Sequence, residues 1–261
     1  MQFNISLRCL DDSPVLPINY QYELSSWIYK TIQNADADYA GFLHQKGYKT
    51  PALKTFKLFC FSQLQVPKRR VVGDRLYIDC REVSLRVGFY VDKAAEEFIR
   101  GLFQEQEMRI GDRISQVRFV VQSVDLLPTI VRTVAPVRLR TLSPLVVAKK
   151  HPDGSQDTYL SPDDPEFGPL LFLNILEKYR AATGGSVPVW WDTNRFGYRL
   201  VGGPPKSQLI KIKTGTDAQT KIRGWRFSFE LDVPPELLEL GFGAGWGRMN
   251  GEGFGFVGLD G

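Results

Sequence analysis

The stretch Val83-Ser-Leu-Arg-Val-Gly-Phe89, followed shortly by Asp92-Lys-Ala-Ala-Glu-Glu-Phe-Ile-Arg-Gly-Leu-Phe103, decides the fold. Apolar side chains alternate with other residues through 83–89, which is the period of a strand with one buried face. From residue 92 onward the apolar residues recur instead at helical spacing, and Asp92 is a candidate N-cap. The sequence therefore predicts a strand that leads directly into an amphipathic helix.

The residues on both sides extend this pattern into a complete unit. Alternating apolar residues predict strands over 3–9 and 115–124, and residues 54–62 and 75–80 also read as strands. Helical spacing predicts one helix over 24–32 and a shorter one over 37–46, with Asp36 as its N-cap and Gly47 just past its end. The order β-α-β-β-α-β is that of the ferredoxin-like arrangement, an α+β fold.

The second half of the chain repeats this order of elements, although no identity between the halves is visible. Leu127-Pro128 is the predicted hinge, and an extended segment follows. The remaining predicted elements are a helix from Asp164-Pro165 to about residue 179, strands near 197–202, 206–213 and 221–231, a helix over 236–240 that Pro234-Pro235 starts and Gly241 ends, and a final strand. The chain is thus expected to hold tandem ferredoxin-like (RRM-like) domains over residues 1–127 and 128–261.

Residues 241–261 form a glycine-rich loop that holds nine of the 24 glycines. Composition alone leaves a flexible tail open, but bulky apolar residues alternate with the glycines, which favours an ordered loop. Backbone N–H groups beside Arg248 are suited to cradle an anion such as phosphate. Residues 253–258 match G-x-G-x-x-G, yet only three residues follow, so no dinucleotide fold can be built on them.

Composition restricts the class of protein. The chain has 261 residues, a net charge of +4 and 43% hydrophobic residues, which suits one large or two small globular domains. The spacing of Cys9, Cys60 and Cys80 among apolar residues predicts buried, reduced thiols, as in the cytoplasm. Neither a signal peptide nor an apolar run of membrane-spanning length is apparent, so no membrane partner is expected.

Basic residues concentrate between residues 201 and 230, and the tightest basic clusters are Lys68-Arg69-Arg70 and Lys149-Lys150-His151. Those between residues 201 and 230 interleave with aromatics and adjoin the glycine-rich loop, a pattern suited to single-stranded nucleic acid. A merely solvated face is the alternative. The predicted RNA contacts are Lys149, Lys150, Lys211, Lys213, Arg223 and Arg248, together with the loop residues Gly245, Trp246, Gly247, Gly253 and Gly255.

Only His44 among the side chains suggests acid–base chemistry. It lies at the end of the predicted helix 37–46, where the helix dipole favours the imidazolium, and nearby lysines act in the opposite direction. A structural or simply exposed histidine is the alternative, and His151, in a polar loop, is better suited to contact RNA. No residues have metal-ligand spacing and no cofactor motif is present, so neither a metal nor a cofactor is expected.

Several stretches of the chain resemble the CRISPR-associated repeat-RNA endoribonucleases of the Cas-six type. The glycine frame of residues 241–255 and the proline-led helix before it are the most specific match. Further matches span nearly the whole chain and comprise residues 141–147 and 209–213, Tyr29, Leu43-His44, and residues 57–62. The chain departs from the pattern of this family at Gly251-Glu252, where many relatives have a pair of residues that begins with serine.

The resemblance implies both a fold and a reaction. It implies two ferredoxin-like domains and metal-independent cleavage of precursor CRISPR RNA within the repeat, with Tyr29, His44 and Lys57 acting together. The expected partners are CRISPR repeat RNA and other CRISPR effector subunits. The competing interpretation is a non-catalytic RNA-binding subunit of a CRISPR surveillance complex. A general RRM-like RNA-binding protein is less suited, because the aromatic signature of those domains does not occur in the sequence.

Overall fold

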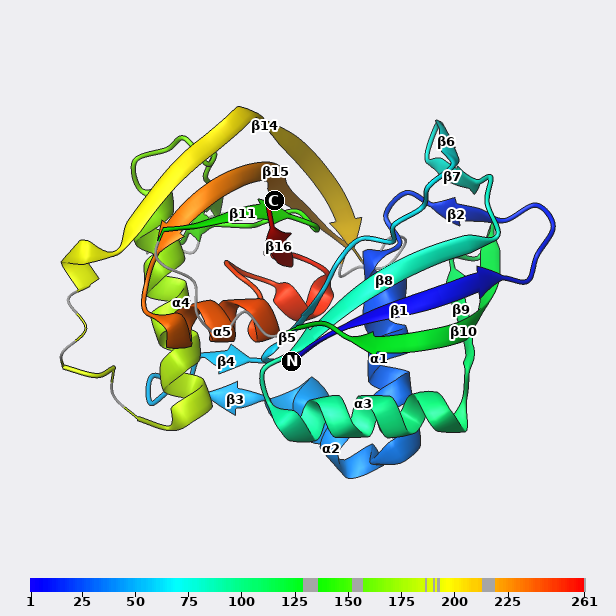
Figure 1. Cartoon of the computed structure of the whole chain (residues 1–261), viewed down its shortest axis with the longest axis horizontal. Coiled ribbons are helices and arrows are strands. Elements are labelled where there is room, and N and C mark those ends of the chain that lie inside the picture. The colour runs from blue at the N-terminus through cyan, green and yellow to red at the C-terminus, as the bar shows by residue number, and fades with distance from the viewer. Residues whose placement is uncertain are drawn as a thin grey trace.

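Two antiparallel sheets, one from each half of the chain, lie side by side with helices packed against them (Figure 1). The computed structural model describes residues 1–128, 136–151, 157–185, 187–189, 191, 193–212 and 219–260. Within these residues no helix is both long and apolar enough to cross a membrane.

The first sheet has five strands in the order β5-β8-β1-β10-β9. Its elements are β1 (Gln2–Cys9), α1 (Gln21–Ala35), β5 (Phe59–Phe61), β8 (Glu82–Phe89), α3 (Asp92–Gln104), β9 (Glu107–Gly111) and β10 (Gln116–Leu126). Without β9 the order is that of a ferredoxin-like sheet, as predicted. The stretch that decides the fold forms β8 and α3, although Val91 is the N-cap and Asp92 is the first helical residue.

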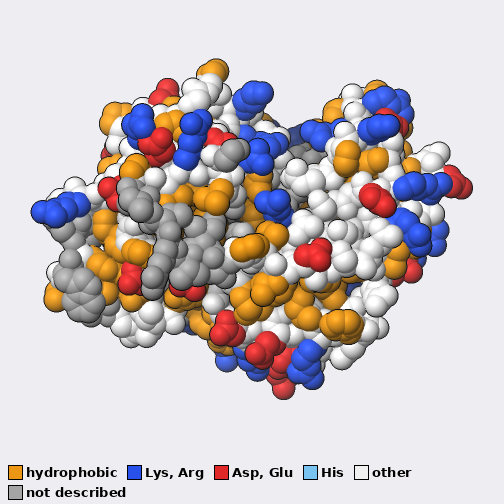
Figure 2. Space-filling model, viewed as in Figure 1, with side chains coloured by type: hydrophobic (Ala, Val, Ile, Leu, Met, Phe, Trp, Pro, Cys, Tyr) orange, Lys and Arg blue, Asp and Glu red, His pale blue; other side chains and the backbone are white. Residues whose placement is uncertain are grey.

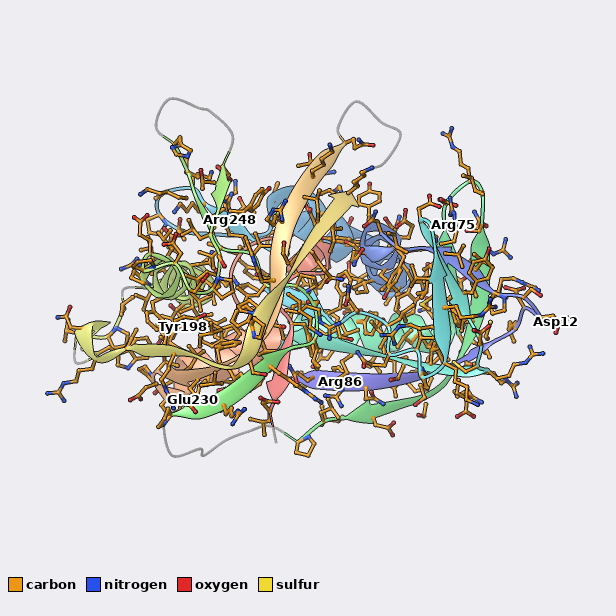
Figure 3. The ribbon with its side chains drawn as sticks, turned by 90° about the horizontal axis from the view of Figure 1, so that it is seen from above. Asp12, Arg75, Arg86, Tyr198, Glu230 and Arg248 are labelled. Atoms are coloured by element: carbon orange, nitrogen blue, oxygen red, sulfur yellow. The ribbon has the colours of Figure 1, made fainter. Side chains whose placement is uncertain are left out.

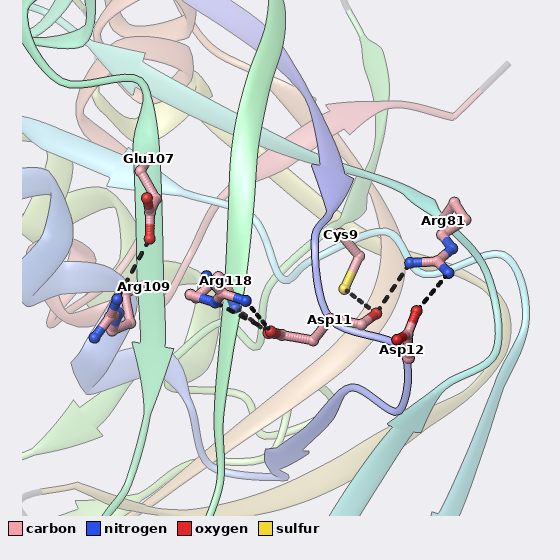
Figure 4. Close-up of polar contacts among 7 residues, drawn as sticks. All are labelled: Cys9, Asp11, Asp12, Arg81, Glu107, Arg109 and Arg118. Atoms are coloured by element: carbon pink, nitrogen blue, oxygen red, sulfur yellow. Dashed lines mark hydrogen bonds and ion pairs between the residues drawn. The ribbon is translucent and has the colours of Figure 1, made fainter.

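Several small elements are added to the first sheet and its helices. The predicted strand over 75–80 is β7 (Arg75–Ile78), which joins a side sheet with β2 (Val15–Pro17) and β6 (Arg69–Val72) rather than the main sheet. Strand β9 was not predicted at all. Just after β1, Asp11 accepts hydrogen bonds from the backbone N–H of Arg118 at 2.7 Å and from its guanidinium at 3.0 and 3.1 Å (Figure 4). Asp11 thereby ties the end of β1 to β10.

The second sheet has four strands in the order β14-β15-β11-β16, so the ferredoxin-like order occurs twice. Its elements are β11 (Val137–Thr141), α4 (Phe167–Thr183), β14 (Gly197–Ile212), β15 (Thr220–Asp232), α5 (Pro235–Ala244) and β16 (Val257–Leu259), with the small hairpin β12 (Ala148–Lys149) and β13 (Thr158–Tyr159) and the short helix η2 (Thr193–Arg195). The two strands predicted over 197–213 are one strand, β14, whose pairing with β15 is irregular between Val201 and Lys206. Helix α4 begins at Phe167, three residues after the predicted start.

The prediction of one strand over residues 54–62 is wrong. Leu58 has a left-handed backbone with φ of 55°, and it separates β4 (Thr55–Phe56) from β5. Strand β4 pairs with β3 (Tyr48–Lys49), whereas β5 pairs with β8 in the main sheet. A bulky residue with positive φ is strained, and such strain is frequent near functional sites.

The two halves share a buried seam. Cys60 of β5 packs with Leu142 and Phe256 of the second half, and its Sγ lies 3.5 Å from the carbonyl oxygen of Gly243. Burial raises the pKa of the Cys60 thiol to about 12, so the thiol is protonated at neutral pH. Cys9 is also buried and all three cysteines are free, as predicted, but Cys80 is only half-buried.

Candidate active site

Tyr29, His44 and Lys57, three residues separated in sequence, meet at one place. The rings of Tyr29 and His44 are in edge-on contact, with centroids 5.2 Å apart and an interplanar angle of 81°. The Lys57 ammonium donates a hydrogen bond of 2.6 Å to the carbonyl oxygen of His44. We call this group the catalytic triad candidate. The structure brings its members together as the resemblance implies.

The helix that carries His44 differs in form from the one predicted. Asp36 caps it as expected, with its side chain accepting from the N–H of Tyr39 at 2.8 Å. The α-helical part, α2 (Ala37–Gly41), gives way to one π-helical turn, η1 (Phe42–Lys46), so that the N–H of Gly47 bonds the carbonyl of Phe42 at 2.8 Å. Such turns are frequent at functional sites. The His44 side chain is exposed and is therefore accessible to a large molecule.

The other two members are partly withdrawn from solvent. Tyr29, on α1, packs its ring against Phe59 with centroids 5.4 Å apart. Burial, with a smaller contribution from the carboxylate of Glu252, raises the pKa of the Tyr29 phenol, so it stays protonated and can donate a hydrogen bond. Burial lowers the pKa of Lys57, and Glu252 acts in the opposite direction.

The glycine-rich loop is an internal structure rather than an exposed cradle. Gly245, Gly247, Gly253 and Gly255 are buried, and Trp246 is fully buried at 0% exposure. A Cβ placed on Gly255, where φ is +71°, would lie 1.8 Å from the backbone oxygen of Trp246, so only glycine fits there. These positions do not suit the predicted direct contacts with RNA.

The backbone N–H groups of this loop are largely used within the protein. Trp246 donates to the carbonyl of Gly255 at 2.9 Å, Arg248 to that of Val146 at 2.8 Å, and Gly255 to that of Pro144 at 2.9 Å. The Asn250 side-chain amide donates to the carbonyls of Trp246 and Phe254, both at 3.0 Å. These donors are engaged within the protein, so a phosphate would have to displace a carbonyl oxygen to bind them.

Gly241 also differs from its predicted role as the end of the last helix. Helix α5 continues through Gly241 to Ala244 and ends at Gly245. A Cβ on Gly241 would lie 2.2 Å from the indole of Trp246, so the missing side chain makes room for this buried ring. Periodicity gave no sign of this close approach.

A buried lysine that the sequence analysis did not identify holds the glycine-rich loop in place. Lys178 of α4 is 2% exposed, and its ammonium donates to the carbonyls of Gly245 at 2.6 Å and Gly247 at 2.9 Å. Burial lowers the pKa of Lys178 to about 7, with the nearby Cys60 acting in the opposite direction. A lysine at helical spacing on α4 resembles any solvent-facing lysine, so the sequence offered no signal of this contact.

The predicted basic residues are spread over the second half, and two of them are paired with carboxylates. Lys149 pairs with Glu166 at 2.8 Å, Arg248 pairs with Asp157 at 2.6 Å, and Arg223 donates to the Ser207 hydroxyl at 2.8 Å. Lys150 and Lys211 are exposed, and Lys213 lies outside the described residues. His151 bonds the Thr158 hydroxyl at 2.8 Å.

A denser group of cations lies where the two halves meet. We call it the junction cluster, and its members are Arg69, Arg86, Arg140 and Arg226. Burial and the neighbouring Arg69 and Arg140 lower the pKa of Arg226. Arg140 pairs with Gly258 across β11 and β16, and the Arg86 guanidinium lies 3.7 Å from the position of a Cβ on that glycine.

The junction cluster is not neutralised by carboxylates. Among the described residues no ion pair joins any of its four arginines to an Asp or Glu. Figure 2 shows Lys and Arg side chains along the upper edge of the molecule, on both sides of a notch between the halves. In Figure 3, Arg86 lies near β8 and β16 at the junction, whereas Arg248 lies well apart on the side of α4. Arg69 and Arg226 belong to basic runs that are visible in the sequence, but the grouping of the four arginines is not, because they come from four separate strands.

Comparison with known proteins agrees with this architecture. Residues 15–125 match the family "CRISPR-associated protein Cas6, N-terminal", and residues 128–259 match "CRISPR associated protein Cas6, C-terminal". The chain is 28% identical to CRISPR-associated endoribonuclease Cas6 1 of Methanocaldococcus jannaschii, covering 98% of this chain and 92% of that protein. It is 27% identical to CRISPR-associated endoribonuclease Cas6 of Pyrococcus furiosus, covering 94% of this chain and 84% of that protein.

Solved structures give the same result. The protein of a Cas6-related gene from Pyrococcus furiosus superposes with a TM-score of 0.81 at 25% identity, covering 99% of this chain and 98% of the other. Together with the family matches over both halves, the chain belongs to the Cas6 family of CRISPR-associated proteins.

Proposed function

We propose that this protein is an endoribonuclease that cuts precursor CRISPR RNA within its repeat, without a metal ion. The observation that carries the proposal is the meeting of Tyr29, His44 and Lys57 at an accessible point. The names of the two curated relatives, both CRISPR-associated endoribonucleases, support the same activity.

The proposed reaction is an attack of the ribose 2′-OH on the adjacent phosphorus. The new bond from O2′ to phosphorus forms as the bond from phosphorus to the 5′ oxygen breaks, leaving a 2′,3′-cyclic phosphate and a 5′-OH. His44 transfers a proton, either from the 2′-OH or to the leaving oxygen. Lys57 stabilises the charge on the phosphorane, and the protonated Tyr29 phenol orients the 2′-OH or donates to a phosphate oxygen.

The mechanism is tested with RNA that carries a single 2′-deoxyribose at the scissile position. We expect no cleavage of this substrate and unchanged cleavage of normal repeat RNA in EDTA, because the nucleophile is part of the substrate and no metal takes part. End analysis should find a cyclic phosphate on the upstream product. Equal cleavage of the deoxy substrate, or loss of activity in EDTA, would contradict the mechanism. Binding without any cleavage of normal RNA would favour the non-catalytic subunit instead.

We further infer that the junction cluster binds the RNA backbone. Four arginines that pair with no carboxylate of the described residues gain most from a polyanion, because neighbouring phosphates replace their mutual repulsion by attraction. Of the basic residues predicted from the sequence to contact RNA, Lys150 and Lys211 remain candidates because both are exposed. Lys213, which lies outside the described residues, also stays a prediction. Lys149, Arg223 and Arg248 would first have to leave the partners they have in this structure.

Replacement of Arg226 by glutamine tests this surface. We expect weaker binding of repeat RNA and a salt dependence of log Kd that is shallower by about one unit, because one phosphate contact is lost. The matched control is Arg199→Gln, which removes the same charge from the same sheet but from a pair with Glu230. If both variants change the salt slope equally, the junction cluster has no special part in binding.

The organisation of the protein follows from these proposals. We infer that residues 1–127 form a domain that carries the catalytic triad candidate, and residues 128–261 a domain that completes the RNA surface. The free thiols suit the reducing cytoplasm. Other CRISPR effector subunits are proposed partners, which co-purification with the tagged chain would identify.

A further inference from the structure

One buried hydrogen bond joins the glycine-rich loop to helix α1. The Ser25 hydroxyl donates to the carbonyl oxygen of Gly251 at 2.6 Å, and Ser25 is only 5% exposed. Gly251 lies in the short helix η3 (Asn250–Glu252). Tyr29 follows Ser25 by one helical turn, so the two side chains lie on the same side of α1. The bond therefore fixes α1 to the second half of the chain close to Tyr29.

Gly251 also contacts the segment that carries Lys57. A Cβ placed on Gly251 would lie 3.4 Å from Cβ of Lys57 and 3.3 Å from the ring of Phe59. The Phe59 ring is itself in edge-on contact with the ring of Tyr29. One residue of the second half is thus in contact with both segments of the first half that supply Tyr29 and Lys57.

The hydroxyl of Ser25 differs in its use from that of the next residue. Ser26 is exposed, and its hydroxyl donates to the carbonyl of Tyr22 in the same helix at 3.0 Å. Ser25 instead donates across the two halves of the chain. A hydrogen bond requires a definite distance and angle, whereas apolar surfaces can slide past one another. The bond from Ser25 therefore restricts how α1 lies against the glycine-rich loop.

We propose that Ser25 is a positioning residue, which through its bond to Gly251 sets the place of the Tyr29 phenol relative to His44 and Lys57. The inference rests on the proposed function for the role of Tyr29 in cleavage. Because Ser25 is buried, we expect it to act on the reaction through Tyr29 rather than through contact with RNA.

The substitution Ser25→Ala removes the hydroxyl. We expect the single-turnover rate at saturating repeat RNA to fall about tenfold, since small displacements of a reacting group are costly. The affinity for RNA should not change, because no contact with RNA is lost. The matched control is Ser26→Ala, which removes a hydroxyl that donates within α1 and should alter neither quantity.

A double-mutant cycle tests whether Ser25 acts through Tyr29. The substitution Ser25→Ala should slow the Tyr29→Phe protein much less than it slows the unsubstituted protein, because two residues that act as a unit have non-additive effects. If the two reductions in rate simply multiply, Ser25 does not act through the phenol and the inference is wrong.

The place of the Tyr29 ring can also be followed without RNA. The chain has two histidines, so proton NMR of His151→Ala identifies the imidazole signals of His44. These protons lie beside the Tyr29 ring, whose ring current changes their chemical shifts. We expect the His44 signals to move in Ser25→Ala and to stay in place in Ser26→Ala. Unchanged signals in Ser25→Ala would contradict the inference.

The variant Ser25→Cys decides the case if the alanine variant does not fold. It retains a side chain of similar size, but a thiol is only a weak donor. Movement of the His44 signals in this variant supports the inference, and unchanged signals contradict it. If the unsubstituted protein does not cut repeat RNA, the proposed function fails while the NMR comparison still tests the role of Ser25, so the two failures are distinguishable.

Discussion

Replacement of His44 by alanine should abolish most RNA cleavage while leaving RNA binding nearly intact. Histidine is the side chain most often used for general acid–base catalysis, and losing such a group costs roughly 10²–10⁴-fold in rate. We expect a reduction of at least about 10²-fold in the single-turnover rate with repeat RNA. Affinity should change little, because phosphate contacts elsewhere dominate binding.

Because His44 is exposed, its replacement should leave the rest of the fold undisturbed. The side chain lies at the surface, and the hydrogen bond from Lys57 goes to the backbone carbonyl, which alanine retains. The variant should therefore fold with an unchanged far-UV spectrum. His151→Ala is the control, since it removes the chain's other histidine, whose only described partner is the Thr158 hydroxyl. Cleavage by His44→Ala at the unsubstituted rate would return this histidine to a merely exposed role.

The second large effect concerns stability. Gly255→Ala should destabilise the protein by about 4 kcal/mol or more, or prevent folding, because the added carbon meets backbone rather than a side chain that can move. The clash is with the carbonyl oxygen of Trp246, which is itself bonded to the Asn250 amide. Urea unfolding followed by circular dichroism measures the free energy of unfolding.

The matched control separates steric clash from backbone strain. Gly184, at the end of α4, has φ of +65°, but nothing lies within 4 Å of a Cβ placed there. Gly184→Ala should therefore cost only the strain of a left-handed residue, about 1–2 kcal/mol. If Gly255→Ala costs no more than this control, the loop is not packed as the structure shows.

The sequence predicted the ferredoxin-like order of elements because periodicity is a local property. The alternation in β8 and the stripe on α3 each arise from one buried face, and both predictions are confirmed. The break at Leu58 was missed since it depends on β4 and β5 pairing with different strands. Strand β9 was missed although it pairs with the next strand, β10, and its buried Met108 and Ile110 alternate with exposed residues.

The candidate site was predictable to a smaller extent. His44 could be singled out from its place at a helix end, whereas Tyr29 and Lys57 came only from the resemblance to a family. The glycines were recognised as ordered, but whether their backbone carbonyl and N–H groups face solvent or protein depends on Lys178, Asn250 and Pro144, which are far away in sequence or ordinary in type. The junction cluster is a property of the assembled halves and had no local signal.

The bond between Ser25 and Gly251 joins residues 226 positions apart. A ribosome makes the chain from its N-terminus, so Tyr29, His44 and Lys57 emerge long before the segment that packs behind them. Contacts of such high sequence separation form late in folding, because a large loop must close first. Until Gly251 has been made, the elements that carry Tyr29, His44 and Lys57 lack this hydrogen bond between the two halves.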